Sequence, residues 1–197
     1  MPDRQATVRR TTSETDVTVD LALDGRGQSE CRTGVGFLDH MLDLLTKHAL
    51  FDLKVAAAGD LQTDQHHTVE DVGIALGQAL DRPLADRAGI RRFGAAAVPM
   101  EEALAQVAVD LSGRSTLVFQ VDFGVEKTGD FDTALVEEFL KALVAQGRFN
   151  LHVMVPHGRN AHHIAEAIFK GLAVALRAAV EIDPRRTGVP STKGTLA

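Results

Sequence analysis

The sequence predicts an α+β fold made of two copies of one strand-strand-helix-strand-helix unit, with the sheets packed on a layer of helices. Two patterns alternate along the chain. Some segments alternate apolar and polar side chains, as strands do, and others repeat apolar residues at helical spacing. This order of segments occurs twice. A His-His-x-x-Glu motif also occurs twice, at residues 66–70 and 162–166, at the same place in each copy. These observations indicate an internal duplication.

The first copy begins with a half-buried strand, because Val17–Leu23 alternates in polarity and is followed by a glycine-containing turn. The helical spacing of Leu38, Leu42 and Leu45 then predicts a short amphipathic helix. The predicted elements are, in order, strands at 17–23 and 29–33, a helix at 37–48, a strand at 51–55 and a helix at 66–80 that ends near Pro83.

The second copy repeats this order. Its predicted elements are strands at 103–111 and 116–121, a helix at 132–146, a strand at 150–155 and a helix at 162–181. The segments at 38–42 and 51–55 recur at 136–140 and 149–153 with one common offset in residue number. We therefore expect a first half-repeat at residues 1–95 and a second half-repeat with a C-terminal loop at residues 96–197, together forming one compact unit.

Composition excludes several classes of protein. The 197 residues are 45% hydrophobic and 24% charged, as in ordinary globular proteins, and the net charge of −6 argues against binding to nucleic acid or to an anionic membrane. Cys31 is the only cysteine, so no internal disulfide forms. Neither an apolar leader nor a run of about 18 apolar residues is present, and we expect a cytoplasmic protein.

The repeated motif places its polar residues on one side of a helix. At about 100° per residue, His66 and His67 diverge and Glu70 lies between them, whereas the apolar residues form the opposite, core-facing side. His162, His163 and Glu166 have the same geometry, and Lys170 falls on the same face of that helix. The histidines are therefore predicted to lie outside the core.

Imidazole and carboxylate groups without thiolates suit divalent ions such as manganese, iron, zinc or cobalt. A single exposed His-His pair is most simply a solvated pair, but two copies with Glu at the same spacing favour a metal site. The helix at 38–42 and its copy add one residue each, which gives enough ligands for two metals with positions left for a substrate. The predicted ligands are His40, His66, His67, Glu70, Glu138, His162, His163 and Glu166.

A ligand face that points away from its own core must be covered by something else. Either the two halves fold their ligand helices toward each other, or the face meets another subunit. Gly73 and Gly77 lie near this face and permit a close approach. We expect a contribution from both arrangements, and hence an obligate homo-oligomer.

Several motifs occur in a fixed order along the chain: Gly36–Met41, Asp64–Asp71, His162–Ala167 followed by Phe169-Lys170, and Pro190–Gly194. Together they resemble the motifs of the imidazoleglycerol-phosphate dehydratase family of histidine biosynthesis. The resemblance runs from about Arg10 to Gly194, and the order of the motifs makes it specific. It implies removal of water from imidazole glycerol phosphate to give imidazole acetol phosphate, with two Mn²⁺ ions per active site. It also implies a trimer-based cage of 24 subunits with active sites at subunit interfaces.

The resemblance further implies a mechanism and assigns residues. The hydrogen to be removed is not next to a carbonyl, so the imidazole ring must store the electrons. A ring bound by metals as imidazolate would expel the hydroxyl through a diazafulvene-like intermediate, and a carboxylate would take the carbon-bound proton. The eight predicted ligands match family positions, among which Glu138 is histidine in some members. The catalytic residues implied are Glu14, Glu70 and Glu166, among which Glu14 is the acid–base candidate. The implied substrate-binding residues, including those of a C-terminal substrate loop, are Glu14, Arg92, Arg114, Lys170, Ser191 and Lys193.

Two other functions fit part of the pattern. A non-catalytic di-metal protein also uses Glu and His on facing helices, although the strands between the helices do not fit the usual bundle. A metal-dependent hydrolase would use bound hydroxide and would release inorganic phosphate from a phosphate ester. The dehydratase would leave the phosphate attached.

Overall fold

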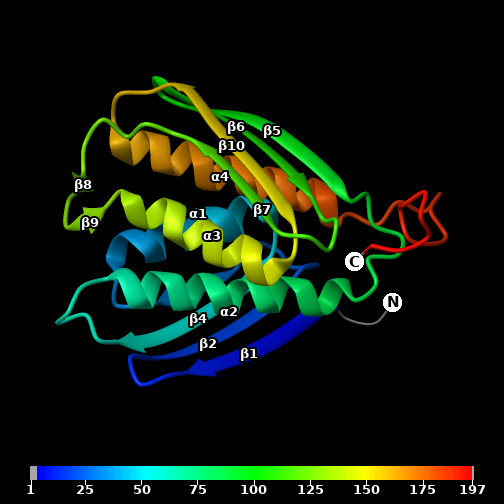
Figure 1. Cartoon of the computed structure of the whole chain (residues 1–197), viewed down its shortest axis with the longest axis horizontal. Coiled ribbons are helices and arrows are strands. Elements are labelled where there is room, and N and C mark those ends of the chain that lie inside the picture. Colours follow the sequence, from blue (N-terminus) through cyan, green and yellow to red (C-terminus); the bar gives the residue numbers. More distant parts are fainter. Residues whose placement is uncertain (1–3, 197) are drawn as a thin grey trace.

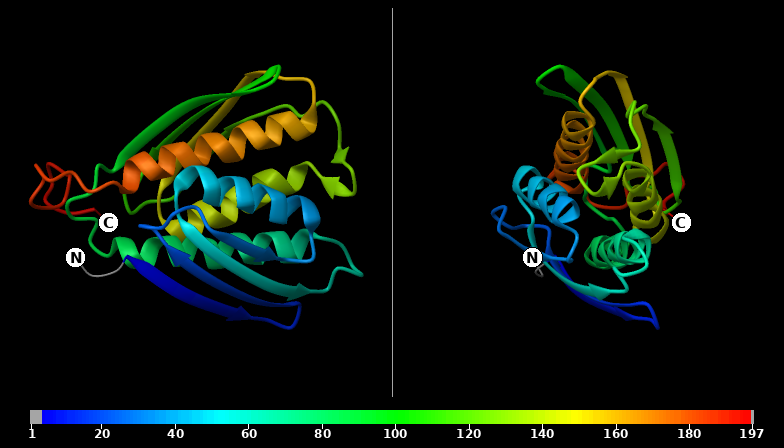
Figure 2. Two further views of the ribbon diagram at one scale, coloured as in Figure 1. Left: turned by 180° about the vertical axis from the view of Figure 1, so that it is seen from behind. Right: turned by 90° about the vertical axis from the view of Figure 1, so that its left-hand side faces the viewer.

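In the described part of the chain, four helices form the interior between two four-stranded sheets. The structure, a computed structural model, describes residues 4–196. Figure 1 shows the four layers as sheet, helices, helices and sheet, and the view from the side in Figure 2 shows the helices enclosed by the two sheets.

The first half contains six elements. They are β1 (Gln5–Thr11), β2 (Thr15–Ala22), β3 (Ser29–Arg32), α1 (Gly36–Ala49), β4 (Asp52–Gly59) and α2 (His66–Leu84). The strands form one sheet in the order β1-β2-β4-β3. The pairs β1–β2 and β2–β4 are antiparallel, and β3 runs parallel to β4.

The second half repeats these elements and the sheet order. Its elements are β5 (Phe93–Met100), β6 (Ala103–Asp110), β7 (Thr116–Gln120), α3 (Ala134–Gly147), β10 (Asn150–His157) and α4 (Ala161–Val180). The sheet order is β5-β6-β10-β7, with β7 parallel to β10. A small hairpin of β8 (Lys127–Thr128) and β9 (Phe131–Asp132) precedes α3. The predicted duplicated α+β fold is confirmed, while the division at residues 95 and 96 stays a prediction and falls within β5.

Each half begins with a strand that the sequence did not predict, so the repeated unit has three strands before its first helix. β1 and β5 are the outer strands of their sheets. β1 fully buries only Val8, and β5 is rich in glycine and alanine and contains Pro99. Neither therefore shows the apolar alternation of a strand. Helix α2 also continues past its predicted end and includes Pro83 in its last turn.

The helices pair across the two halves. α2 packs on α3, and α1 packs on α4. A Cβ added at Gly73 would lie 2.8 Å from the Phe139 carbonyl oxygen, and one at Gly77 would lie 2.6 Å from that of Leu143. The expected close approach at these glycines is therefore confirmed, with α3 as the partner. Each helix that carries a His-His-x-x-Glu motif is thus paired with the shorter helix of the opposite half.

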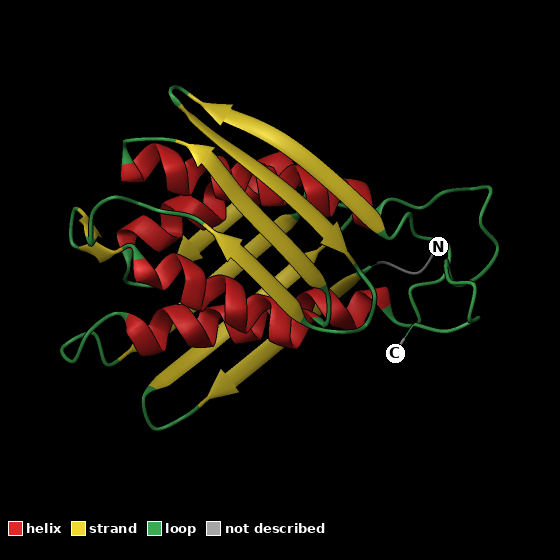
Figure 3. Cartoon of the chain, turned by 45° about the horizontal axis from the view of Figure 1, so that its top comes forward, coloured by secondary structure: helices red, strands yellow, loops and turns green. Residues whose placement is uncertain are grey.

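The predicted core faces of the two long helices are buried, and the histidines lie outside the core. The buried residues are Val69, Val72, Leu76 and Leu80 on α2 and Ala165, Ile168, Leu172 and Leu176 on α4. Figure 3 shows how the strands of each sheet cross the helices that cover its inner face. Within residues 4–196, no helix has the length and apolar character needed to cross a membrane.

Candidate metal and acid–base site

Three predicted ligands converge where α1 meets the start of α4. Nε2 of His40 lies 3.0 Å from Oε1 of Glu166, and Nε2 of His162 lies 2.9 Å from the same oxygen. Lys170, one turn further along α4, donates a hydrogen bond of 2.6 Å to the other oxygen. Glu166 is only 7% exposed. A buried carboxylate is therefore surrounded by two imidazoles and an ammonium group.

The electrostatics keep this carboxylate ionised. Burial raises the pKa of the Glu166 carboxyl, but the hydrogen bonds from Lys170, His40 and His162 outweigh burial and lower the pKa to about 2. An ionised carboxylate beside two imidazoles is a suitable donor set for a divalent cation.

Local structure fixes the start of α4. The side chain of Asn160 caps the helix by accepting a hydrogen bond from the His162 backbone N–H at 3.0 Å. The rings of His162 and Phe37, at the start of α1, pack in a T-shaped arrangement with centroids 5.3 Å apart. The cap and the aromatic contact hold His162 one helical turn before Glu166 and within reach of His40.

The equivalent residues on α2 and α3 do not converge in the same way. Nε2 of His66 lies 4.0 Å from Oε2 of Glu70. Glu138, the counterpart of His40, accepts a hydrogen bond of 2.9 Å from Lys141 on its own helix. Of the residues described, only His40, His162 and Glu166 place three ligand atoms within 4.8 Å of one another.

His67 and His163 each use one ring nitrogen to contact a carboxylate. Nδ1 of His67 lies 3.0 Å from Asp60, and Nδ1 of His163 lies 2.7 Å from Glu102. The Asp60 contact raises the pKa of His67. The pKa of Glu102 is lowered to about 2, chiefly by His163 and also by backbone N–H groups. Metal-binding histidines usually have such a partner on the second ring nitrogen, which leaves Nε2 for the ion.

Sequence reasoning did not identify Asp60 or Glu102. Both lie at strand ends, where turn residues are common and carry little signal. The repeat itself contains a signal that was missed. The β1–β2 and β5–β6 hairpins have the same strand register, which places Glu14 and Glu102 in equivalent turns before β2 and β6. A glutamate in both turns is a further element of the repeat.

Glu14 lies beside the second histidine of the first motif. Its Oε1 is 3.8 Å from Nε2 of His67, and its side chain is 51% exposed. The carboxylate is therefore open to a substrate while its backbone is held in the turn. This position suits an acid–base residue.

The predicted phosphate-binding residues gather around a groove at the other end of the molecule. The groove has a volume of about 590 Å³, and its lining includes Arg92, Arg114, Ser191 and Lys193. Arg92 makes two hydrogen bonds to Asp110, of 2.6 and 3.0 Å, and donates a third to the Pro190 carbonyl. Lys170, the remaining predicted substrate-binding cation, lies in the Glu166 cluster and not in this groove.

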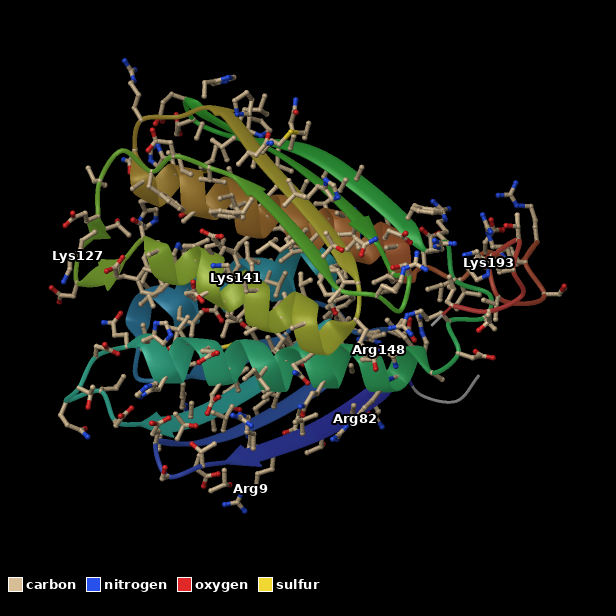
Figure 4. All side chains as sticks on the ribbon, in the orientation of Figure 1. Arg9, Arg82, Lys127, Lys141, Arg148 and Lys193 are labelled. Carbon is tan, nitrogen blue, oxygen red and sulfur yellow. The ribbon has the colours of Figure 1, made fainter. Side chains whose placement is uncertain are left out.

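The groove and the Glu166 cluster lie far apart within one chain. The Arg92 backbone N–H bonds to the carbonyl of Ala179, in the last turns of α4, whereas Glu166 lies near its start. The helical rise between Glu166 and Ala179 corresponds to about 20 Å. Figure 4 shows Lys193 in the C-terminal loop, at the end of the molecule opposite Lys127 and the hairpin that precedes α3.

The duplicated α+β fold and the His-His-x-x-Glu motif at the start of each long helix define a class of duplicated enzymes with a repeated polar motif. The sequence profile of the family described as "Imidazoleglycerol-phosphate dehydratase" matches residues 33–176. The chain belongs to this family, as its motifs predicted, and it is a lyase of histidine biosynthesis.

Relatives and solved structures agree with this assignment. The chain is 58% identical to an imidazoleglycerol-phosphate dehydratase of Halalkalibacterium halodurans, with 98% of this chain and 100% of the relative covered. The crystal structure of the Staphylococcus aureus enzyme has a TM-score of 0.83 and 40% identity, covering 91% of this chain and 99% of that one. A Pyrococcus furiosus structure in complex with (S)-C348 has a TM-score of 0.84 and 39% identity, covering 96% and 100%.

Proposed function

We propose that the chain converts imidazole glycerol phosphate to imidazole acetol phosphate and water in the cytoplasm, with two manganese ions in each active site. The convergence of His40, His162 and Glu166 is the observation that carries this proposal. A buried, ionised carboxylate with two imidazoles on one oxygen is a fitting donor set for a divalent cation, and it has no need of thiolates.

The eight residues named from the sequence would hold the two ions. His40, His162 and Glu166 form one half-site, and His66, Glu70 and Glu138 form its counterpart on α2 and α3. His67 and His163 have Nδ1 engaged by carboxylates, so their Nε2 atoms are available to complete sites on a neighbouring subunit. When bound, the cations supply positive charge that stabilises the substrate's ring as an anion.

The chain's own residues position the substrate and move its protons. Glu14 takes the carbon-bound proton, because its carboxylate is exposed beside His67. Glu70 and Glu166, the other two carboxylates of the predicted catalytic set, act by helping to hold the cations that stabilise the ring. Arg92, Arg114, Ser191 and Lys193 bind the phosphate, for which guanidinium and ammonium donors are suited.

An active site made in this way requires more than one subunit. The phosphate groove lies about 20 Å along α4 from Glu166, which is longer than a small phosphorylated imidazole. The groove of one subunit must therefore meet the metal cluster of another. This supports a homo-oligomer with active sites at its interfaces, and we propose the trimer-based cage of 24 subunits.

Activity and phosphate release measured in one reaction test the proposal. The protein is reconstituted with Mn²⁺ and given imidazole glycerol phosphate, and the ketone is followed by its enol absorbance after base treatment while free phosphate is counted. The background is low because the chain has no Trp or Tyr. Manganese-dependent ketone without free phosphate is expected. Free phosphate would indicate the hydrolase, and a metal-loaded protein without product would indicate a non-catalytic metal protein.

A further inference from the structure

A cluster of three polar residues, Arg10, Thr15 and Asp71, lies next to the turn that carries Glu14. Asp71, on α2, is only 5% exposed. Arg10 donates a hydrogen bond of 2.8 Å to one of its carboxylate oxygens, and the hydroxyl of Thr15 donates to the other. None of these three residues belongs to the proposed metal, acid–base or phosphate-binding set.

This group joins α2 to the backbone of Glu14. Thr12 Oγ1 accepts hydrogen bonds from the backbone N–H groups of Glu14 and Thr15, at 3.1 and 3.0 Å. Thr15 in turn contacts Asp71, which lies one helical turn after His67 on the same face of α2. One short path of hydrogen bonds therefore links the residue that bears the acid–base carboxylate to the helix that bears His67.

The second half of the protein shows that the fold does not need this group. Strand register makes Val98 and Ala103 the equivalents of Arg10 and Thr15, because both hairpins pair their strands in the same way. The repeated His-His motif makes Ala167 the equivalent of Asp71. Ala103 and Ala167 are fully buried.

The environment of two glycines supports the same correspondence. A Cβ added at Gly59, at the end of β4, would contact Thr68 and Thr15. One added at Gly158, just after β10, would contact Ile164 and Ala103. The same space is therefore filled by threonines in the first half and by apolar side chains in the second.

Burial of the Asp71 carboxylate costs desolvation energy, and apolar packing of equal volume is often at least as stable. The second half uses that apolar solution. The polar cluster in the first half is therefore better explained by a role in positioning the neighbouring turn than by a contribution to the stability of the fold.

We propose that Asp71 is a positioning residue, which acts through Thr15 to hold Glu14 against His67. This inference rests on the proposed function, in which Glu14 moves a proton. A misplaced acid–base group loses turnover without losing substrate binding, because only the reacting geometry changes. The group should therefore affect kcat more than KM.

The first test removes the Thr15 hydroxyl. In the metal-loaded oligomer, Thr15→Val should lower kcat by about ten- to a hundredfold, with KM and manganese content unchanged. Thr15→Ser, which keeps the hydroxyl, should retain wild-type kcat. Thr7→Val is the matched control, because Thr7 makes a similar bond to Asp20 on the exposed face of the same sheet. Asp71→Asn is a second variant with the same expected loss of kcat.

A double mutant separates positioning from a general effect on the fold. In a Glu14→Gln background, Thr15→Val should cause no further loss of kcat, because the path ends at Glu14. The inference would be overturned if Thr15→Val kept the wild-type kcat. It would also be overturned if the loss of kcat in the double mutant equalled the product of the losses in the two single mutants. A wild-type protein without activity would instead contradict the proposed function. In that case, crystal structures of wild type and Thr15→Val would test the positioning role of Asp71. An unchanged distance between Glu14 and His67 in Thr15→Val would overturn that role.

Discussion

Lys170 Nζ lies 2.6 Å from Glu166 Oε2, and the residue equivalent to this lysine on α2 is Ile74. The two repeated carboxylates therefore have different electrostatic surroundings. Glu166 is buried and contacts a cation of its own helix, whereas Glu70 is 46% exposed in its side chain. The duplicated motif has diverged. Among the described residues, only the α1–α4 pair brings three predicted ligands together, whereas the α2–α3 pair does not.

Replacement of this lysine should change the protonation of Glu166. Lys170→Met should raise the pKa of Glu166, because burial already raises it and the lysine contributes the largest opposing effect. A carbon-13 NMR titration of labelled glutamate carboxyls in the metal-free protein measures the change. Lys54→Met, which removes an exposed ion pair with Glu30, should leave the Glu166 titration unchanged. An unaltered Glu166 in Lys170→Met would contradict the prediction.

The sequence predicted the elements whose apolar period is long and regular. The four helices and the central strands β2 and β4 bury several side chains on one face, so their pattern is visible locally. β1 and β5 form by pairing with β2 and β6 and by packing against α2 and α4. That pairing is a long-range property, and a segment with one buried residue such as Val8 gives no local sign of it.

The candidate site was predictable where it was repeated. The two His-His-x-x-Glu motifs and the counterparts His40 and Glu138 could be located from their offsets. The contact of α1 with α4 depends on how the halves pack, and no local pattern specifies that packing. The carboxylates of Asp60 and Glu102 were missed for the same reason, since each contacts a histidine only after the strands and helices have assembled.

Arg114 should affect substrate binding without affecting the fold. Its side chain is exposed in the groove that Ser191 and Lys193 also line. Arg114→Ala should raise KM by about ten- to a hundredfold, which corresponds to the loss of a charged hydrogen bond of about 1.5–3 kcal/mol. Steady-state kinetics and thermal denaturation together test this. Arg32→Ala, on the exposed face of β3, is the control and should change neither quantity.

A lower melting temperature of Arg114→Ala with unchanged KM would show that the residue is structural.

Arg92→Ala should behave differently from Arg114→Ala. Because Arg92 also bonds to Asp110 and to the Pro190 carbonyl, its loss should reduce stability as well as substrate affinity.

Asp183 should make the segment after α4 sensitive to acid. Hydrogen bonds from Arg185, first from its side chain and then from its backbone N–H, lower the pKa of Asp183 below its ordinary value of 3.8. A carboxyl group whose pKa is lowered by folding stabilises the folded state at pH values above its ordinary pKa. This stabilisation is lost as the pH falls toward the pKa of the folded state. Asp183→Asn should therefore be less stable than wild type near neutral pH, and the difference should shrink below about pH 4.

Denaturant midpoints measured by circular dichroism across this pH range give the comparison. Arg185→Gln should reproduce the loss, because it removes the partner that lowers the pKa. A difference between wild type and Asp183→Asn that stays constant with pH would show that the carboxylate acts through its shape and not through its charge.

Two inactive variants should restore each other if the active site is shared between subunits. Glu166→Gln damages the ligand cluster, and a double variant of Arg114→Ala with Lys193→Ala damages the groove. Each should be inactive alone. In an oligomer mixed at random from equal amounts, about one quarter of the sites would combine an intact cluster from one subunit with an intact groove from another. The recovered kcat per site should approach this fraction.

The control for this experiment mixes Glu166→Gln with His162→Ala. Both substitutions damage the same cluster within one chain, so no combination of subunits restores it, and the mixture should stay inactive. Mass spectrometry of the intact oligomers establishes that subunits of both kinds are present. If mixed oligomers of the cluster and groove variants remained inactive, the two sets of residues would have to act within one chain. The distance of about 20 Å along α4 argues against that arrangement, because a rigid helix separates them and does not shorten on binding a small substrate.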